Sequence, residues 1–403
     1  MYNEHPLSFD EAESHWLECI DELSLEHQLT QCNNRLPVTL KCELFLRNHP
    51  LPKPVAVGLG KGINFQQCQL SSQYEALEHY LTLSHSKNID FPHICLSYNQ
   101  VKQSSLNTLE NFWEENFFEQ VPLDHPLTWL EFYNYRRPEQ KYYMPLALFN
   151  ADYLKTPHNR DNLNCDNMFY FSSNSGSAIG ANFDEALVHA IGEIIERDSW
   201  SHFLKKCFLY NTDPVKLIKK TTMPKKLQQL IVDIQVCDNT QLVVYDLNST
   251  VKGFYAYGAQ FLNYDNRCVP YYGYGCSINP QFAAQRAILE AKQIKDSNEC
   301  MTNDDFYEQF KHVLDFPELM RCVKSDILNK IEEKNSINIS LPQSENKYCA
   351  MKEIKEKVLS SLKDSDIYIH NHQIFKNGVS HLIVFLPNRS QFCAVQNGYP
   401  CIP

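Results

Sequence analysis

The feature that most constrains the fold is a glycine- and serine-rich loop that runs into a long helical pattern, SNSGSAIGANFDEALVHAIGEIIERDSW, at residues 173–200. Asn182 is a favoured N-cap residue and is predicted to begin the helix. At about 100° per residue, Glu185, Glu193 and Glu196 fall within an arc of about 80° on one side, and the apolar side chains fall on the opposite side. The pattern predicts a long helix that buries one face and carries a stripe of acids on the other.

Two more helical patterns carry acids in a similar way. The segment SSQYEALEHYLTL places Glu75 and Glu78 three positions apart, on one helix face. Upstream of it, GLGKG is predicted to form a turn that holds Lys61 between two glycines. Later, GYGCSINPQFAAQRAILEAKQ repeats the order of glycine-containing loop and helix, with Arg286 and Glu290 four positions apart. Taken singly, each pattern is typical of a solvated surface helix, and the last spacing suits an ordinary ion pair.

A different chemistry follows if the three acidic faces meet. Five carboxylates cannot share one pocket as bare anions: some would be protonated or the pocket would open, unless divalent cations neutralise them. Mg²⁺ takes oxygen ligands and commonly joins carboxylates to phosphate oxygens. Arg197, directly after Glu196, and Arg286 would then offer paired hydrogen bonds to phosphate. The sequence therefore suggests a site for Mg²⁺ and a nucleoside triphosphate that does without a P-loop.

The rest of the chain favours a mixed α/β (α+β) fold, with helices packed on mixed sheets. A length of 403 residues allows one to three domains, and 43% hydrophobic residues is ordinary for a globular protein. We expect a core at residues 51–300, preceded by a helix and a strand within residues 1–50 and followed by a helical and strand-containing part at residues 301–403. The clearest predicted elements are helices at residues 9–23 and 71–84 and strands at residues 38–46, 142–149, 242–248 and 253–262.

Composition argues against several classes of function. The formal net charge is -11 and no long basic run exists, so nucleic acid is not an expected partner. The first residues lack an apolar signal region, and no apolar run approaches the ~18 residues of a membrane span. Fifteen cysteines occur without a C-x-x-C pair, which suits reduced thiols in the cytoplasm. His370 and His372 share one strand face, but a pair without a third ligand favours a structural role over a metal site.

In combination, the motifs resemble the YcaO family. The resemblance rests on GKG followed by S-x-x-x-E-x-x-E (from Ser71), on SGSAIGANFDEA followed by E-x-x-E-R-D (from Ser175) and on R-x-x-x-E-x-x-Q (from Arg286). It implies an ATP-binding fold in which the nucleotide is held between helices and sheets. It also implies an enzyme that phosphorylates the oxygen of a peptide backbone amide, with ATP and Mg²⁺. A Cys, Ser or Thr side chain as nucleophile would give a thiazoline or oxazoline, sulfide would give a thioamide, and an amine would give an amidine.

The resemblance also assigns roles to the matching positions. The acids at metal-binding positions are Glu75, Glu78, Glu193, Glu196 and Glu290. The residues at positions lining the nucleotide are Lys61, Ser71, Glu185, Arg197 and Arg286. The resemblance implies catalytic roles for Glu196, Arg197 and the terminal Pro403. Pro403 is included because azoline-forming members often end in a proline-rich tail that reaches the active site. Two positions depart from the usual pattern: Asn182 is shifted by one residue relative to the common A-G-N-T, and Arg286 stands where glutamine is frequent.

Partners follow from the same resemblance. A precursor peptide is the expected substrate, on a route to a ribosomally made, post-translationally modified peptide such as a bacteriocin or antibiotic. Few residues precede the motifs, so a separate leader-peptide-binding protein of E1-like type is expected. A flavin dehydrogenase partner and a homodimer are further hypotheses. The proline-containing end favours cyclodehydration; the alternatives are thioamide or macroamidine formation, an accessory role in modifying a ribosomal protein, and a non-catalytic scaffold of a synthetase complex.

Overall fold

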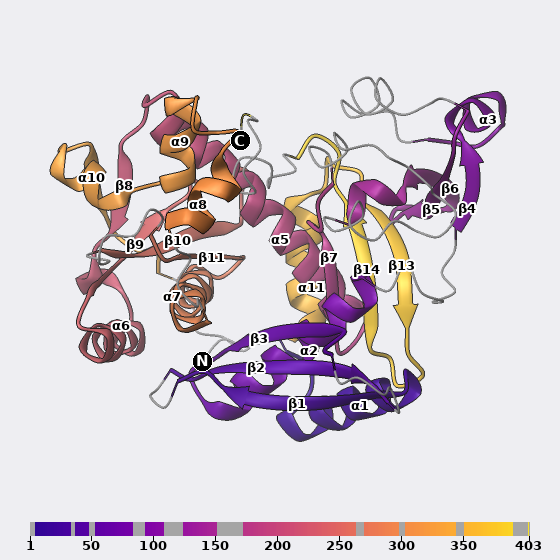
Figure 1. Ribbon diagram of the computed structural model, residues 1–403, viewed down its shortest axis with the longest axis horizontal. Helices are drawn as coiled ribbons and strands as arrows, with labels where there is room; N and C mark the ends of the chain where they lie inside the picture. Colours follow the sequence, from indigo (N-terminus) through magenta and orange to yellow (C-terminus); the bar gives the residue numbers. More distant parts are fainter. Residues whose placement is uncertain are drawn as a thin grey trace.

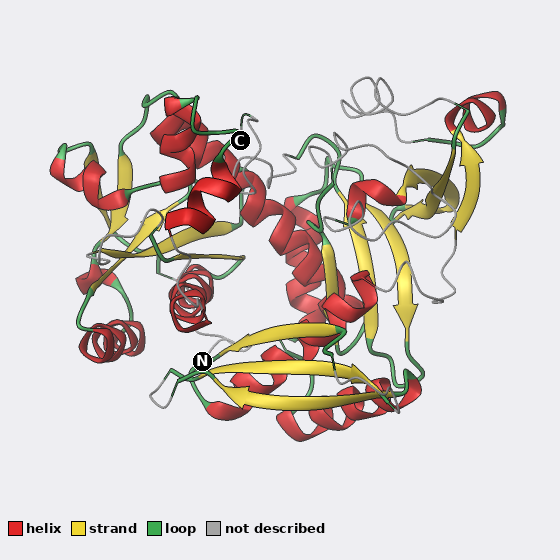
Figure 2. Cartoon of the chain, in the orientation of Figure 1, coloured by secondary structure: helices red, strands yellow, loops and turns green. Residues whose placement is uncertain are grey.

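Three sheets and the helices packed on them build the molecule (Figures 1 and 2). The computed structural model describes residues 5–33, 37–47, 53–83, 93–108, 124–150, 172–262, 270–297, 303–343, 350–389 and 402. The prediction of a mixed helix and sheet fold is confirmed. Within these residues, no helix is both long enough and apolar enough to cross a membrane.

The first part of the chain forms an antiparallel three-stranded sheet covered by two helices. Its strands, in spatial order, are β1 (Leu25–Gln31), β2 (Thr39–Leu46) and β3 (Ala56–Lys61). Helix α1 (Phe9–Glu22) begins at a capping box formed by Ser8 and Glu11, and α2 (Phe65–Leu83) packs on β3. The first predicted helix and the strand at residues 38–46 are confirmed, and α2 begins earlier than predicted.

The first four residues of the segment GLGKG lie in strand β3, so the segment does not form the predicted turn. A Cβ atom on Gly58 would lie 2.2 Å from the backbone nitrogen of Ala76, and one on Gly60 would lie 1.9 Å from the carbonyl oxygen of Cys68. Any side chain at either position would push α2 away from the sheet. The glycines therefore allow a tight contact between β3 and α2. Lys61 is the last residue of β3.

Helix α5 (Phe183–Leu204) runs through the middle of the molecule, between two sheets (Figure 1). Asn182 is its N-cap, as predicted, and the Asn182 side chain accepts the N–H of Glu185 at 3.0 Å. On one side the helix contacts β7 (Ser177–Gly180) and β14 (Ser380–Phe385), and on the other it contacts β11 (Tyr272–Ser277). Most of its side chains are buried, so α5 is a core element.

A five-stranded sheet lies on one side of α5. Its strands, in spatial order, are β11, β10 (Tyr255–Leu262), β9 (Gln241–Asp246), β8 (Val215–Ile218) and β12 (Ser336–Ile339). Helix α7 (Pro280–Ser297) covers β11 and β10. The predicted strands at residues 242–248 and 253–262 are confirmed as β9 and β10. The surrounding helices are α6 (Lys225–Asp238), α8 (Asn303–Phe310), α9 (Pro317–Lys324) and α10 (Ile327–Glu332).

A six-stranded sheet lies on the other side of α5 and joins distant parts of the chain. Its strands are β4 (His93–Ser97), β5 (Pro126–Asn134), β13 (Tyr368–Ile374), β14 and β7 in spatial order, with β6 (Arg137–Pro145) paired to β5. Helix α3 (Tyr98–Gln103) follows β4, and α11 (Met351–Ser361) packs against α5. Strands of the predicted C-terminal part thus pair with strands of the predicted core.

The strand predicted at residues 142–149 is wrong in its second half. Pairing ends at Pro145, and Leu146–Phe149 forms a 3₁₀ helix. Proline has no N–H to donate to a sheet, so it commonly ends strand pairing. The apolar run continues because the 3₁₀ helix is buried too.

Candidate functional site

The acidic faces of α2, α5 and α7 come together in one place, although the helices are far apart in the chain. Five half-buried carboxylates influence one another there, and we call them the acid cluster: Glu75, Glu78, Glu193, Glu196 and Glu290. Glu78 of α2 faces Glu193 of α5, and Glu196 of α5 faces Glu290 of α7. The structure therefore gathers all five predicted metal-binding residues.

One backbone amide within β7 and one just before it orient two of these acids. The N–H of Ile179 donates to Oε2 of Glu78 at 3.1 Å, and the N–H of Gly176 donates to Oε2 of Glu193 at 3.1 Å. Gly176 has a φ of +84°, a conformation that favours glycine. The motif SGSAIG thus positions side chains of two different helices, a role that its sequence alone did not reveal.

Burial and like charge raise the pKa values of three acids in the cluster. Burial raises the pKa of Glu196 to about 7, with a further contribution from Glu290, against the opposing charges of Arg286 and Lys61. Burial also raises the pKa of Glu75, and it raises that of Glu78 well above its ordinary range, reinforced by neighbouring carboxylates. The anionic forms of these three acids are therefore poorly stabilised by their surroundings, which favours a bound cation.

Lys61 and Ser71 lie at the border of the cluster. The ammonium group of Lys61 forms an ion pair with Glu290, so it joins β3 to α7. The backbone N–H of Lys61 donates to the hydroxyl of Ser71 at 3.3 Å. Gln293, one turn beyond Glu290, donates to the carbonyl of Leu59 and strengthens the same contact between α7 and β3.

Arg197 is held at the edge of the acid cluster by the glycine- and serine-rich loop. Its guanidinium group donates to Asn174 Oδ1 and to Ser175 Oγ, each at 2.9 Å, and it lies 2.6 Å from Glu193 Oε1. Asn174 was not among the predicted site residues, although it belongs to the glycine- and serine-rich loop that precedes α5. The position of Arg197 connects this loop to the acids.

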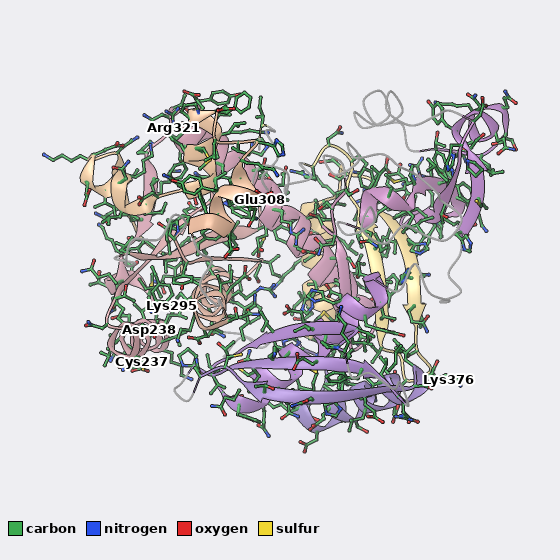
Figure 3. The ribbon with its side chains drawn as sticks, in the orientation of Figure 1. Cys237, Asp238, Lys295, Glu308, Arg321 and Lys376 are labelled. Carbon is green, nitrogen blue, oxygen red and sulfur yellow. The ribbon has the colours of Figure 1, made fainter. Side chains whose placement is uncertain are left out.

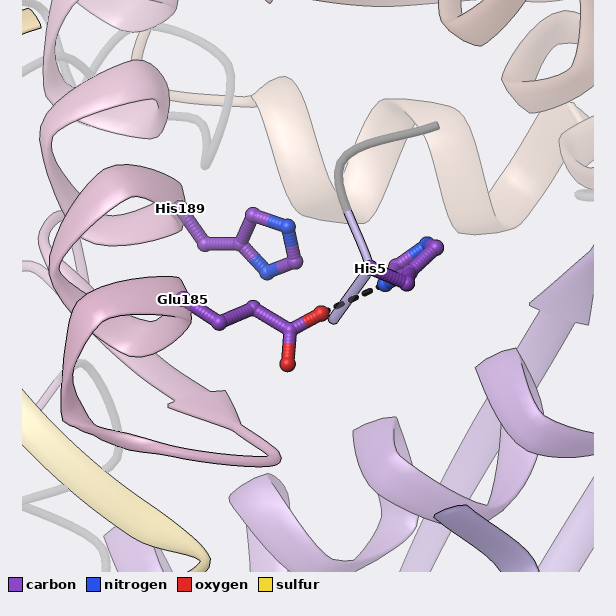
Figure 4. Close-up of side chains that lie close together, drawn as sticks. All are labelled: His5, Glu185 and His189. Atoms are coloured by element: carbon purple, nitrogen blue, oxygen red, sulfur yellow. Dashed lines mark hydrogen bonds and ion pairs between the residues drawn. The ribbon is translucent and has the colours of Figure 1, made fainter. Parts of the chain in front are cut away.

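Glu185, the first acid of the stripe on α5, lies beside His5 and His189 (Figure 4). Oε2 of Glu185 accepts the N–H of Ala181 at 2.7 Å, and its Oε1 lies 2.5 Å from His5 Nδ1. Burial acts to raise the pKa of Glu185, but the hydrogen bonds and charge of His5 and the nearby His189 hold that pKa below its ordinary value. Nothing in the sequence pattern indicated that His5 would reach this helix.

A small pocket opens beside Arg286 on the α7 side of α5. Its cavity volume is only about 10 Å³, and it is lined by α5, β11, α7 and α11, with His189, Gly192, Ser277 and Arg286 among its residues. A Cβ atom added at Gly192 would meet nothing within 4 Å. The glycine therefore leaves open space in front of Arg286.

The predicted catalytic Pro403 lies outside the described residues. Among the described residues, the guanidinium group of Arg389 lies 3.2 Å from Asp198 Oδ2. Asp198 is buried on α5, two positions after Glu196, and it also accepts the hydroxyl of Thr250 at 2.5 Å. Residue 389 therefore stands close to the acid-bearing part of α5.

Comparisons with known proteins agree on the fold. YcaO from Methanopyrus kandleri bound with AMPPCP and Mg²⁺ is similar at 16% identity and a TM-score of 0.63, over 94% of this chain and 91% of that one. A heterocyclase in complex with substrate and cofactor has a TM-score of 0.64 at 15% identity; the match covers 98% of this chain and 54% of that one. The Escherichia coli microcin synthetase McbBCD complex with pro-MccB17 bound has a TM-score of 0.54 at 12% identity, over 89% and 87% of the two chains.

The sequence comparison identifies the family. No curated protein sequence matches the chain. The sequence model described as YcaO cyclodehydratase, ATP- and Mg²⁺-binding, matches residues 59–369, which is most of the chain. The resemblance inferred from the motifs is thereby confirmed, and the chain belongs to the YcaO family.

Proposed function

We propose that this protein uses ATP and Mg²⁺ to activate backbone amides of a precursor peptide and forms thiazoline or oxazoline rings from Cys, Ser or Thr. The family is described as an ATP- and Mg²⁺-binding cyclodehydratase family, which supports this chemistry. The observation that carries the proposal is the acid cluster, in which five carboxylates from three helices share one half-buried place. Such a concentration of like charge at raised pKa is typical of a functional site.

The acid cluster fits Mg²⁺ by the chemistry of its donors. Mg²⁺ prefers oxygen ligands and is usually held by carboxylates together with substrate phosphates. We assign Glu75, Glu78, Glu193, Glu196 and Glu290 as the residues that would hold it. When bound, Mg²⁺ would neutralise charge on the phosphates of ATP. Glu196 receives a catalytic role because the carboxylates of α5 and α7 repel its charge, while Lys61 and Arg286 attract it.

Five residues around the cluster are proposed to line the nucleotide: Lys61, Ser71, Glu185, Arg197 and Arg286. The two arginines suit phosphate because a guanidinium group donates two parallel hydrogen bonds. Arg197 already bonds loop oxygens and Glu193, so the loop would hold its guanidinium group in place for phosphate. Glu185 would lose its hydrogen bond with His5 and would contact the nucleotide in its place.

The reaction we propose conserves atoms in three stages. The sulfur or oxygen of the Cys, Ser or Thr side chain adds to the carbon of the preceding backbone carbonyl and loses its proton. The resulting oxyanion takes the terminal phosphoryl group of ATP, and ADP leaves. The amide nitrogen then loses its proton as the C–O bond breaks, so that phosphate departs and a C=N bond completes the ring. Catalysis of this kind depends on positioning and charge neutralisation, which the acid cluster and the arginines would supply.

We also propose that a separate leader-peptide-binding protein brings the precursor peptide to this chain. The similar microcin synthetase McbBCD is a complex with pro-MccB17 bound, which supports this hypothesis. A flavin dehydrogenase, a homodimer and a cytoplasmic location remain part of the same hypothesis. The terminal Pro403 is proposed to take part in catalysis.

Peptide-dependent ATP turnover tests the proposal. The chain would be combined with a partner and a candidate precursor peptide encoded beside it, and ATP consumption and peptide mass would be followed together. We expect loss of one water from the peptide for each phosphate released. Exchange of oxygen for sulfur would instead identify thioamide formation, and absence of peptide-dependent turnover would leave the scaffold function.

A further inference from the structure

His5, Glu185 and His189 form a compact group of potential metal ligands (Figure 4), and none of the three is a member of the acid cluster. One ligand atom from each side chain lies within 4.8 Å of the other two. Glu185 and His189 are four positions apart on α5, so they stand on consecutive turns of the same face. His5 reaches them from the segment that precedes α1, and Figure 4 shows the three side chains directed toward one another.

The backbone of β7 and the residue after it hold the two helical members from behind. The N–H of Ala181 donates to Glu185 Oε2 at 2.7 Å, which leaves Oε1 facing His5. The ring of His189 is hydrogen-bonded to the backbone of Ile179, which fixes the orientation of the imidazole. Metal-binding histidines and carboxylates usually have such outer partners, because these fix the ring orientation and the free lone pair.

His5, the third member, is partly exposed, so its side chain can move and an ion can reach it from solvent. The His5 side chain is 45% exposed, whereas the Glu185 side chain is 4% exposed. His5 Nδ1 now lies 2.5 Å from Glu185 Oε1, which is a direct contact. A metal between these atoms would need only a small outward movement of His5, which lies in a short segment ahead of α1.

The chemistry of this group differs from that of the acid cluster. Two imidazoles and one carboxylate suit Zn²⁺ and other transition-metal dications, while a set of carboxylates suits Mg²⁺. Three protein ligands would also leave one coordination position open to water or to another ligand. Helix α5 therefore offers two kinds of site. Glu185 and His189 near its start suit a transition metal, and Glu193 and Glu196 further along suit Mg²⁺.

We propose that His5, Glu185 and His189 bind a transition-metal dication of the Zn²⁺ class, which fastens the N-terminal segment to the first turns of α5. The site needs neither nucleotide nor peptide, so its existence is independent of the proposed enzymatic function. Where that function also holds, the ion would engage Glu185 and so compete with the nucleotide for this residue.

Direct titration with Co²⁺ tests the site. The metal-stripped, nucleotide-free protein would be titrated in a large excess of Mg²⁺, which occupies the acid cluster, and the visible absorption of bound Co²⁺ would report its ligands. We expect one Co²⁺ per chain, displaced by Zn²⁺, without the near-ultraviolet charge-transfer band of a thiolate ligand. His5→Ala and His189→Ala should each weaken Co²⁺ binding by at least about tenfold. His312→Ala, at an exposed histidine before α9, should not.

His5→Ala is the deciding variant, because His5 is partly exposed and its loss leaves the core unchanged. Unchanged Co²⁺ affinity in His5→Ala would overturn the proposal. A thiolate band that persists in both histidine variants would overturn it too, since cysteines elsewhere would then be the ligands. If His189→Ala alters the circular dichroism of the metal-free protein, the result for His5→Ala decides alone.

Discussion

Helix α7 contributes to two charged regions, one with equal numbers of cations and anions and one made of carboxylates. Glu290 belongs to the acid cluster, whereas Lys292 and Lys295 belong to a network with Asp238 of α6 and Asp296 (Figure 3 labels Asp238 and Lys295). In the network, Lys292 lies 3.3 Å from Asp238 and pairs with Asp296, and Lys295 lies 3.3 Å from Asp238. Two cations therefore meet two anions, and the charges balance.

The balanced network stabilises the fold, whereas the acid cluster is the proposed site for a bound cation. In the balanced network, Asp296 also accepts the hydroxyl of Thr39 at 2.8 Å, so the network joins α6 and α7 to β2. The acid cluster is not neutralised internally, and burial with like charge raises the pKa values of three of its members. Removing a charge should therefore destabilise the network and relieve the cluster.

The largest effect on stability is expected from Lys292→Met. The side chain of Lys292 is 5% exposed, so its loss leaves two carboxylates with one cation fewer in a buried place. We expect the free energy of unfolding to fall by about 3 kcal/mol or more. Urea denaturation measures it, and Lys311→Met, which breaks an exposed pair with Glu308, should cost less than about 1 kcal/mol. Equal losses in both variants would contradict the structural role of the network.

Glu196→Gln should have the opposite signature. We expect ATP turnover to fall by about 100-fold or more, because a central ligand of the proposed Mg²⁺ site loses its charge. The same variant should be as stable as the parent protein, or more stable, in urea without Mg²⁺, since one like charge is removed. Glu308→Gln on the surface of α8 (Figure 3) is the matched control and should keep full turnover. Unchanged turnover in Glu196→Gln would remove this residue from the site.

Addition of Mg²⁺ should stabilise the protein through the cluster alone. At ten times the dissociation constant, binding to the folded state raises the free energy of unfolding by about 1.4 kcal/mol. Lys292→Met should retain this increment and Glu196→Gln should lose most of it, which thermal unfolding can measure. An increment that disappears in Lys292→Met and survives in Glu196→Gln would reverse the assignment of the two regions.

A dependence of stability on pH is also expected from Glu196. The pKa of Glu196 is about 7 in the folded protein and near 4.5 in an unfolded chain, so the folded state keeps this proton to higher pH. The stability that follows is complete below the lower value and is lost as pH rises through the higher one. Without Mg²⁺, the free energy of unfolding of the parent protein relative to Glu196→Gln should therefore fall between about pH 5 and about pH 8. A constant difference across this range would contradict the raised pKa.

Local patterns in the sequence predicted the helices and the acids on them. Asn182 begins α5 as its capping preference indicates, and the periodic spacing of acids placed Glu193 and Glu196 on one face. These features depend only on neighbouring residues, so a single helix contains all the information. The family resemblance then joined the three helices into one expected site.

The partners of those acids could not be predicted, because they come from distant segments. The amides that bind Glu78 and Glu193 belong to the neighbourhood of β7, and the imidazole that reaches Glu185 belongs to His5. Side-chain spacing says nothing about which backbone N–H lies opposite. The strand character of GLGKG was missed for a similar reason, since its glycines are required by the packing of α2 and not by a turn.

A crystal structure with Mn²⁺ and a non-hydrolysable ATP analogue tests the central claim most directly. Mn²⁺ takes the oxygen ligands that suit Mg²⁺, and its anomalous scattering locates it without ambiguity. We expect manganese bound to carboxylates of the acid cluster, with the triphosphate between α2, α5 and α7. Manganese and nucleotide bound elsewhere, with the five carboxylates free of metal, would contradict it.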